Sequence, residues 1–448
     1  MALSQKRSNR LLPMTAFRTR WVGLICLAGA LLAAAPPAKA DDYRDARAEL
    51  VAAYQANEYD AMVVAAHKAL AARPGFPGAL FNLALAHALN DEAAASLRVL
   101  EALAGMGIDF GADEMEEFAA LRTLPAWPSY SDRVKALYTP VGEARVAMRL
   151  DDGHFVPEGV AVDDDGTIYL GSIRKGELRR DDDLLSRRQG HWSVFGMRFD
   201  GEGGLWFASA AVAQMSDVGE DEGRTGLFRV DVETGEITRS AVLPESDGKQ
   251  LLGDLVMHDN VLFSTDSLGG AVYRYDIEDD SFTAIVERGG LGSPQGLVVD
   301  EAREHLYVAD YIGGLYRVSL DDASVVRLTI PDVMTDYGID GLYRYNNELI
   351  AIQNGIRPHR VVAFQLGDDG ISIVSARTLL SNHEAFDEPT LGVVRGDEFY
   401  LVANSHWNRF DAENGLPEGL TGPIVLKLML TSHTRVDRSY QNEYSDPQ

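Results

Sequence analysis

A repeating pattern of apolar and polar residues divides the chain beyond residue 151 into short strand-like segments. Its first copy is PEGVAVDDDGTIYL, from Pro157 to Leu170, in which an acidic turn with Gly166 separates two apolar runs. Two such runs around a glycine-containing turn predict a β-hairpin. Further copies of this hairpin begin at Phe195, Leu252, Pro294, Ile339 and Glu388.

A third run of alternating polarity follows each hairpin, for example GLFRVDV from Gly226 and GLYRVSL from Gly314. A repeat of roughly 40 to 50 residues with about four short strands is typical of a β-propeller. An ordinary β-sandwich is the alternative fold, but sandwiches have regular turns without a recurring hairpin formula. We therefore predict a mainly β protein with a six-bladed β-propeller over residues 152–430 and a polar C-terminal tail at 431–448.

The chain before the propeller has apolar residues at helical spacing and little glycine outside its turns. The stretch PGALFNLALAHALNDEAAA resembles a tetratricopeptide repeat, with small residues where helices approach closely. Because stable solenoids generally need about three repeats, we expect this region to lean on the propeller or to be capped by a helix at 114–124. It is either a plain packing domain or a site for a protein or peptide partner. Helix pairs are predicted at 43–56 with 60–72 and at 78–88 with 92–104, within a helical domain at 41–137 that a linker at 138–151 follows.

Residues 1–40 have the features of an export signal. Basic residues precede an apolar run from Trp21 to Ala35, and Ala38-Lys39-Ala40 forms a small-x-small cleavage site. A membrane anchor would need about 20 apolar residues, and this run is shorter. The only cysteine, Cys26, lies in this leader, so neither disulfides nor thiol catalysis is expected in the mature chain. We predict a periplasmic or secreted protein.

The strongly acidic composition excludes nucleic acid as an expected partner. The formal net charge is −27, and removal of the leader, which carries six basic residues and no acidic ones, makes it −33. Such a surface concentrates cations in general but identifies no particular site. After cleavage of the leader, no remaining stretch is apolar enough to predict a membrane span.

In a propeller the innermost strands surround a central channel, so one position of each repeat points to a common axis. Carboxylate and amide oxygens at such positions suit a hard cation, with calcium as the first candidate. The alternative is that these acids cap strands and accept backbone hydrogen bonds. Alignment of the hairpins places Glu158, Gly196, Gly253 with Asp254 next to it, Gln295, Asp340 and Thr390 at this position, and the second strands end near Ser172, Ser209, Asp266, Asp310, Asn354 and Asn404.

The repeats PEGVAVD, PQGLVVD with YVADY, and IDGLYRY resemble those of the senescence marker protein and gluconolactonase family, and more distantly those of the paraoxonases. The resemblance extends from about Asp152 to Leu430. It implies a six-bladed propeller that hydrolyses a lactone or ester at one divalent cation in the channel.

The resemblance also implies roles for individual residues. Glu158 stands at the metal-binding glutamate of the family's E-G motif, and Asp340 at the D-G aspartate, a metal ligand and often the catalytic base. Gln295 replaces the asparagine of a P-N-G motif and is one methylene longer. Gly253-Asp254 stands at an asparagine-aspartate pair, so that Asp254 is a further ligand or base while Gly253 offers no side chain.

His406, beside Trp407 after the last hairpin, is a further candidate catalytic group because a histidine at the channel mouth can relay protons. Such a pair more often packs a loop. The sequence has no G-x-S-x-G, H-E-x-x-H or phosphate-binding glycine motif, which gives serine hydrolases, zinc peptidases and nucleotide enzymes no support. Two functions remain, a cation-dependent lactonase or esterase for a small molecule and a non-catalytic scaffold that binds a protein, peptide or sugar.

Overall fold

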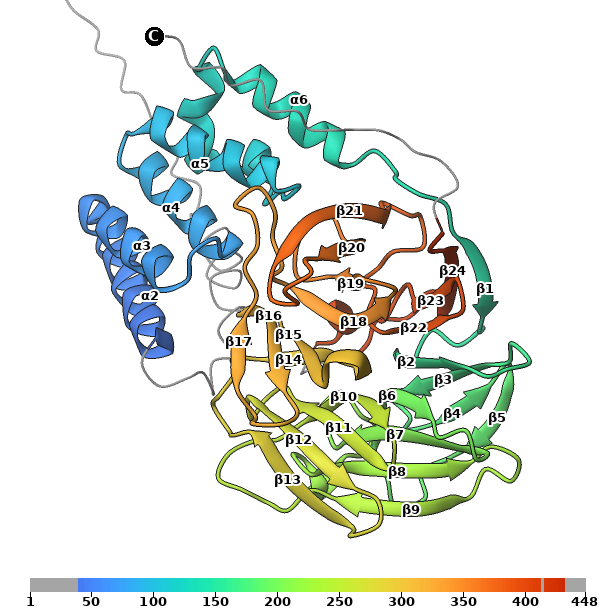
Figure 1. Cartoon of the computed structure of the whole chain (residues 1–448). Helices are drawn as coiled ribbons and strands as arrows, with labels where there is room; N and C mark the ends of the chain where they lie inside the picture. The colour runs from blue at the N-terminus through green and yellow to red at the C-terminus, as the bar shows by residue number, and fades with distance from the viewer. Residues whose placement is uncertain (1–38, 412–414, 432–448) are drawn as a thin grey trace, which may run out of the picture.

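The computed structural model describes residues 39–411 and 415–431, which form a helical region followed by a six-bladed β-propeller (Figure 1). The predicted fold is therefore confirmed. The proposed export signal lies outside the described residues except for its last two positions, and so does the proposed tail except for Thr431. Among the described residues, no helix is long and apolar enough to cross a membrane.

The helical region contains the two predicted helix pairs. Ala79, Ala84 and Ala86 are fully buried, as expected where helices approach closely. The helix expected at 114–124 forms as two 3-10 turns, and a further α-helix precedes the propeller. The elements are α2 (Lys39–Ala56), α3 (Tyr59–Ala72), α4 (Pro77–Leu89), α5 (Ala93–Gly105), η1 (Ala112–Glu114), η2 (Glu116–Thr123) and α6 (Trp127–Leu137).

Five blades of the propeller are four-stranded antiparallel meanders of consecutive strands. The first two are β2 (Pro157–Val162), β3 (Ile168–Ser172), β4 (Leu178–Arg180) and β5 (Asp183–Ser186), then β6 (Ser193–Phe199), β7 (Gly204–Ala210), β8 (Thr225–Asp231) and β9 (Ile237–Val242). The next two are β10 (Leu252–His258), β11 (Val261–Asp266), β12 (Ala271–Asp276) and β13 (Ser281–Val286), then β14 (Pro294–Asp300), β15 (His305–Asp310), β16 (Gly314–Ser319) and β17 (Val325–Arg327). The fifth is β18 (Ile339–Tyr345), β19 (Glu348–Gln353), β20 (Arg360–Leu366) and β21 (Ile373–Ser381).

The sixth blade joins the two ends of the propeller. Its strands are β22 (Gly392–Arg395), β23 (Glu398–Val402), β24 (Ile424–Met429) and, outermost, β1 (Arg145–Arg149). Strand β1 pairs with β24 with Val146 opposite Leu426, although it lies within the segment expected to be only a linker. The propeller therefore begins before residue 152. Sequence pattern missed this strand because its partner comes from the far end of the chain.

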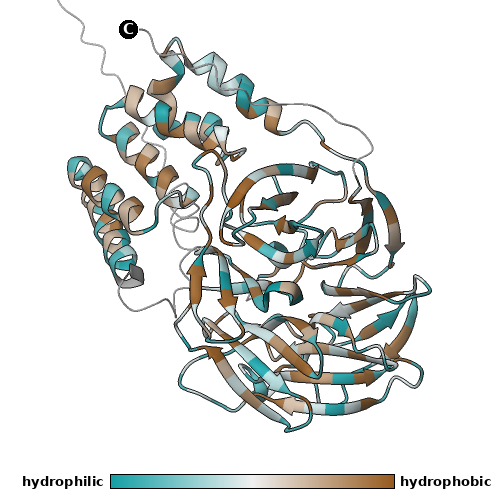
Figure 2. Ribbon diagram, viewed as in Figure 1, coloured by the Kyte–Doolittle hydropathy of each residue, from teal (hydrophilic) through white to brown (hydrophobic). Residues whose placement is uncertain are grey.

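Glycines allow the innermost strands to pack against each other in a closed ring. A Cβ on Gly159 would lie 1.9 Å from the carbonyl oxygen of Phe195 in the next blade, and one on Gly296 would lie 2.3 Å from the amide nitrogen of Leu342. These separations are too short for any other residue. Buried apolar residues of neighbouring blades pack together in shared clusters. The strands of the propeller carry many of these hydrophobic residues, brown in Figure 2.

The helical region is docked on the fifth blade. Ile356, in the loop between β19 and β20, is 5% exposed and belongs to the apolar core of the helical region. Arg360 donates from Nη1 to the carbonyl oxygen of Gly107 at 3.3 Å, and the Tyr337 hydroxyl donates to the carbonyl oxygen of Pro74 at 3.1 Å. The loop that carries Ile356 begins at Asn354, whose side-chain amide donates to Asp340, so one short segment joins the helical region to the channel.

Candidate functional site

The channel-facing residues lie at a bulge that recurs in the innermost strands. In each of the first five blades the strand register shifts over two residues, and these include Glu158, Asp254, Gln295 and Asp340. A bulge bends the strand and re-aims a side chain, which explains why the repeat presents polar groups here. In the second blade the register makes Phe195, not Gly196, the equivalent of Glu158, so the alignment was one residue out at this point.

Four carboxylates share the end of the channel. Asp254, Asp340 and Glu388 are close enough to Glu158 to raise the pKa of its buried carboxyl, and Asp254 and Glu388 act in the same way on Asp340. The structure thus brings together the three acids expected from the sequence. It adds Glu388, which precedes the expected position Thr390 and adopts a left-handed backbone with φ of 63°.

Glu158 is a deeply buried member of the expected ligand set, with 6% exposure. Burial raises the pKa of its carboxyl well above the usual value, and Asp340 raises it further. The indole N–H of Trp407 donates to Oε2 of Glu158 at 2.6 Å and opposes this shift. Trp407 belongs to the sixth blade and Glu158 to the first, so this hydrogen bond joins the two blades at the channel.

Asp340 titrates near neutral pH. Burial raises the pKa of its carboxyl to about 7, and Glu388 and Asp254 act in the same direction. The side-chain amide of Asn354 donates to Oδ2 of Asp340 at 2.6 Å and lowers the pKa. Two interacting acids with raised pKa values hold at least part of one proton between them at pH 7 unless a cation neutralises them.

Asp254 is held at the edge of this cluster. Its Oδ1 accepts the backbone N–H of Leu255 at 2.8 Å and lies 3.9 Å from Nη2 of Arg198. Burial raises the pKa of Asp254, while Arg198 lowers it. A Cβ on Gly196 would stand 2.3 Å from Oδ1, so the glycine in the neighbouring blade makes room for this carboxylate.

Gln295 and Gly253, the two positions that depart from the family's amide residues, lie close together in the structure. Gln295 donates from Nε2 to the hydroxyl of Ser293 at 3.1 Å. Its side-chain oxygen Oε1 lies 3.9 Å from the place where a side chain at Gly253 would begin. The long side chain of Gln295 therefore reaches the space that a side chain at position 253 would enter.

His406 lies behind the channel wall. It is 3% exposed, donates from Nε2 to the carbonyl oxygen of Thr421 at 2.7 Å, and places Nδ1 3.4 Å from Oδ2 of Asp387. These contacts fix the loop that carries Trp407, which is the packing role considered beside the proton relay.

Acids at the ends of the second strands have a structural role. Asp266, considered as a fourth carboxylate of the site, accepts the backbone N–H groups of Leu251 and Gly269 and pairs with Arg288 at 3.1 Å. Asp310 likewise accepts the backbone N–H of Ser293. Asp266 and Asp310 therefore accept backbone hydrogen bonds at strand ends, as the alternative explanation proposed.

Tyr311 is a channel residue that sequence reasoning missed. Burial raises the pKa of its phenol, and Asp340 and Glu388 raise it further, so the hydroxyl stays protonated at neutral pH. Its position directly after Asp310, at the end of a second strand, is the only sequence signal that points to it.

The donor set fits a cation in part. Asp254 Oδ2 and Asn354 Oδ1 are buried without a hydrogen-bond partner among the described residues. Oxygen atoms of this kind suit calcium. However, no three His, Cys, Asp or Glu side chains in the described part of the chain are grouped as a metal site. A cation here would therefore need amide oxygens or water beside Glu158 and Asp340.

The fold and this site define a six-bladed β-propeller with buried carboxylates at one end of its channel. Residues 146–178, from β1 to the start of β4, match the family described as strictosidine synthase-like, N-terminal. No curated protein sequence matches the chain. The resemblance of the repeats to the gluconolactonase family stays a prediction.

Two solved structures are similar to part of the chain. One is the PQQ-bound aldose sugar dehydrogenase from Streptomyces coelicolor, with 12% identity and a TM-score of 0.45, covering 64% of this chain and 99% of that chain. The other is a putative oxidoreductase (glucose dehydrogenase) from Thermus thermophilus, with 16% identity and a TM-score of 0.43 over the same shares of both chains.

Proposed function

We propose that the protein hydrolyses a small lactone or ester at the channel carboxylates. The observation that carries this proposal is the interacting pair of Glu158, which is buried, and Asp340, which is half-buried and whose pKa burial raises to about 7. A carboxylate that titrates near neutral pH can accept a proton from water and return it to a leaving alcohol. Asp340 is the candidate base, and Asp254 is held too firmly by Arg198 and Leu255 to be preferred.

Neighbouring side chains support this role. Trp407 fixes one oxygen of Glu158, and Asn354 fixes one oxygen of Asp340. The protonated phenol of Tyr311 can donate a hydrogen bond where negative charge develops on a carbonyl oxygen. Burial strengthens each of these interactions because water does not screen them.

A divalent cation is part of the proposal, and the oxygen donors favour calcium. Glu158 and Asp340 would hold it with the amide oxygen of Asn354 or Gln295. When bound, it would polarise the carbonyl of the substrate as a Lewis acid. The leader sequence supports export, so we place this activity in the periplasm or outside the cell.

Activity measurements on paired variants test the proposal. We expect the mature protein with calcium to hydrolyse members of a panel of lactones and aryl esters, and Asp340→Asn or Glu158→Gln to lower kcat/KM by about 100-fold or more. Glu278→Gln, at an exposed turn of the third blade, is the matched control and should keep full activity. Undiminished hydrolysis by both channel variants would overturn the assignment.

Binding without catalysis is the second candidate function. Two observations support it. The indole N–H of Trp407 already binds one oxygen of Glu158, and the described residues contain no group of three His, Cys, Asp or Glu side chains placed to hold a metal ion. In this case the helical region would hold a protein or peptide partner. Absence of hydrolysis across the panel, together with saturable binding of a partner by the intact chain, would select this function.

A further inference from the structure

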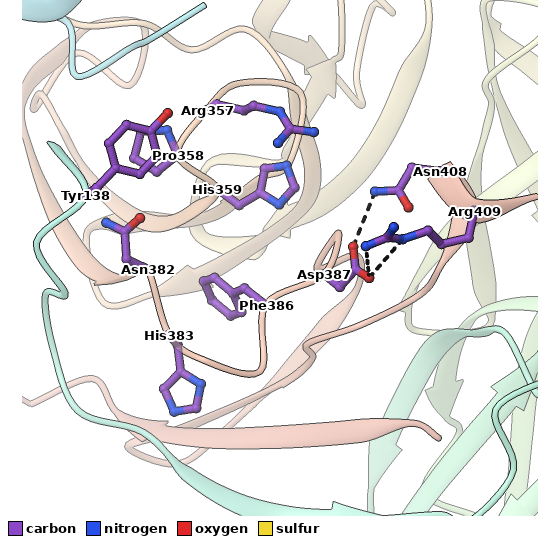
Figure 3. Close-up of a pocket in the computed structure, with 10 residues that line it drawn as sticks. All are labelled: Tyr138, Arg357, Pro358, His359, Asn382, His383, Phe386, Asp387, Asn408 and Arg409. Atoms are coloured by element: carbon purple, nitrogen blue, oxygen red, sulfur yellow. Dashed lines mark hydrogen bonds and ion pairs between the residues drawn. The ribbon is translucent and has the colours of Figure 1, made fainter. Parts of the chain in front are cut away.

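A cavity of about 650 Å³ lies beside the channel, between the end of α6 and the loops of blades five and six (Figure 3). It lies outside the carboxylate cluster described above. The residues of its wall that bear on ligand chemistry are Tyr138, Arg357, His359, Asn382, Phe386 and Asn408.

The wall of the cavity carries a guanidinium without a direct ion-pair partner among the described residues. Arg357 is exposed, and its guanidinium makes no ion pair or hydrogen bond with the residues that the structure describes. Arg409 is neutralised by Asp387 at 3.1 Å. Burial and Arg357 lower the pKa of His359 to about 4, so this imidazole is neutral at pH 7. In a chain of net charge −27, an unpaired guanidinium at a cavity wall favours an anionic ligand.

The remaining wall suits a hydroxylated ligand. Asn382 uses its amide nitrogen on the carbonyl oxygen of Leu137 at 2.8 Å, which leaves the amide oxygen as an acceptor for a hydroxyl group. The neutral imidazole of His359 offers both a donor and an acceptor. The ring of Phe386 adds an apolar surface on which the C–H face of a sugar can rest (Figure 3).

The cavity and the channel share a wall. Asn408 donates its backbone N–H to Oε2 of Glu388 at 2.7 Å, and its side-chain amide to Oδ1 of Asp387 at 3.4 Å. Glu388 belongs to the channel carboxylates, while Asp387 lines the cavity. Burial raises the pKa of Glu388 and Arg357 opposes this shift, so the guanidinium is near enough to act on this channel acid.

We propose that this cavity binds a small polyhydroxylated carboxylate, of the sugar-acid class, with the carboxylate on Arg357. A guanidinium binds a carboxylate through two parallel hydrogen bonds, which a neutral sugar cannot form. The proposal goes beyond hydrolysis in the channel and does not depend on it.

Calorimetric titration of the mature protein with D-glucuronate and D-glucose tests the proposal, because the two sugars differ at one carboxylate. We expect saturable binding of D-glucuronate only. Arg357→Gln should weaken it by about tenfold or more, and Arg357→Lys, which keeps the charge without the planar fork, by less. Arg239→Gln is the matched control because Arg239 is exposed on β9 of the second blade. Thermal melting of each variant confirms that it is folded.

A channel variant separates this site from the proposed active site. The double variant Glu158→Gln with Asp340→Asn should bind D-glucuronate as tightly as the unchanged protein. The proposal is overturned by absence of saturable binding, by equal binding of D-glucose, or by binding that survives Arg357→Gln. It is also overturned if the channel variant alone abolishes binding, since the ligand would then occupy the carboxylate site.

Discussion

At the scale of single residues, the protein places several carboxylates close together in the channel, where their like charges repel each other. Glu158 is buried, Asp340 and Glu388 are half-buried beside it, and all three have a raised pKa. Burial of like charges costs stability unless a proton or cation neutralises them. Perturbed acids of this kind cluster at functional sites, which is why the channel is the preferred site of chemistry.

The raised pKa of Asp340 makes a prediction about pH. Its carboxyl titrates at about 7 in the folded protein and at 3.8 when unperturbed, so the folded state holds the proton more tightly. Its contribution to stability is present at low pH and is lost as pH rises from about 4 to 7. Asp340→Asn removes this loss, which is at most about 4 kcal/mol in the free energy of unfolding. In the presence of a chelator, the difference in stability between the variant and the unchanged protein should therefore shift in favour of the variant as pH rises from 5 to 8. Urea unfolding at both pH values measures this.

The control for this measurement is Asp279→Asn, at an exposed turn, which should leave the pH dependence unchanged. Calcium should reduce the difference between Asp340→Asn and the unchanged protein at pH 8 if the cation neutralises the cluster. An identical pH dependence for Asp340→Asn and the unchanged protein would show that Asp340 does not hold a proton in the folded state.

Gly196 is predicted to be intolerant of even one methyl group. In Gly196→Ala the new Cβ would lie 2.3 Å from Oδ1 and 2.8 Å from Cα of Asp254, so backbone must move. We expect a loss of about 1 to 3 kcal/mol in the free energy of unfolding. Gly105→Ala is the control, since no atom lies within 4 Å of its Cβ position, and should be neutral or slightly stabilising. Equal denaturant midpoints for the two variants would contradict the close packing.

At the scale of elements, loops between blades do more than connect strands. The loop after β19 begins beside Asn354, inserts Ile356 into the helical region and ends near Arg360. The channel and the helical region are therefore joined by one short segment. A helical region held in this way is fixed relative to the channel.

Arg360 is predicted to hold the helical region in place. Burial lowers its pKa to about 10, and its guanidinium donates to Gln353 at 2.8 Å and to the carbonyl oxygens of Met106 and Gly107. Arg360→Met leaves these acceptors unpaired, so we expect a loss of about 3 kcal/mol and faster proteolytic cleavage within residues 138–144. Limited proteolysis with mass spectrometry measures the cleavage. Arg377→Met, at a partly exposed ion pair with Glu348, should change neither property by much, and the same behaviour in both variants would argue against this role of Arg360.

At the scale of the whole molecule, the propeller is closed by pairing its first strand with its last. Strand β1 covers the outer edge of β24, which would otherwise expose unpaired backbone groups. A short segment joins the helical region to β1, so closure of the ring also helps to hold the helical region against the fifth blade (Figure 1).

Two truncations test this closure. A chain that begins at residue 139 keeps β1, and a chain that begins at residue 151 lacks it, while both lack the helical region. We expect the longer chain to remain monomeric and folded and the shorter one to aggregate or melt at a lower temperature, because β24 becomes an open edge. Size-exclusion chromatography and thermal melting compare them. Equal behaviour of the two chains would mean that β1 is not needed for closure.

The sequence by itself determined the six blades and the helix pairs, because each is built from neighbouring segments whose periodicity records which face is buried. It also identified Glu158, Asp254 and Asp340, since a fixed place in a repeat maps to the axis of a propeller. The one-residue error at Gly196 arose because a bulge interrupts the alternation on which the alignment rested.

Only the tertiary structure decided the membership of β1, the position of His406 and the inclusion of Glu388 and Tyr311 in the channel. It alone also showed the cavity at Arg357. These features depend on loops and on pairings between distant parts of the chain, which no local pattern encodes. The physical reason is that periodicity specifies regular elements, whereas a site at their ends is set by how the closed ring packs the irregular segments together.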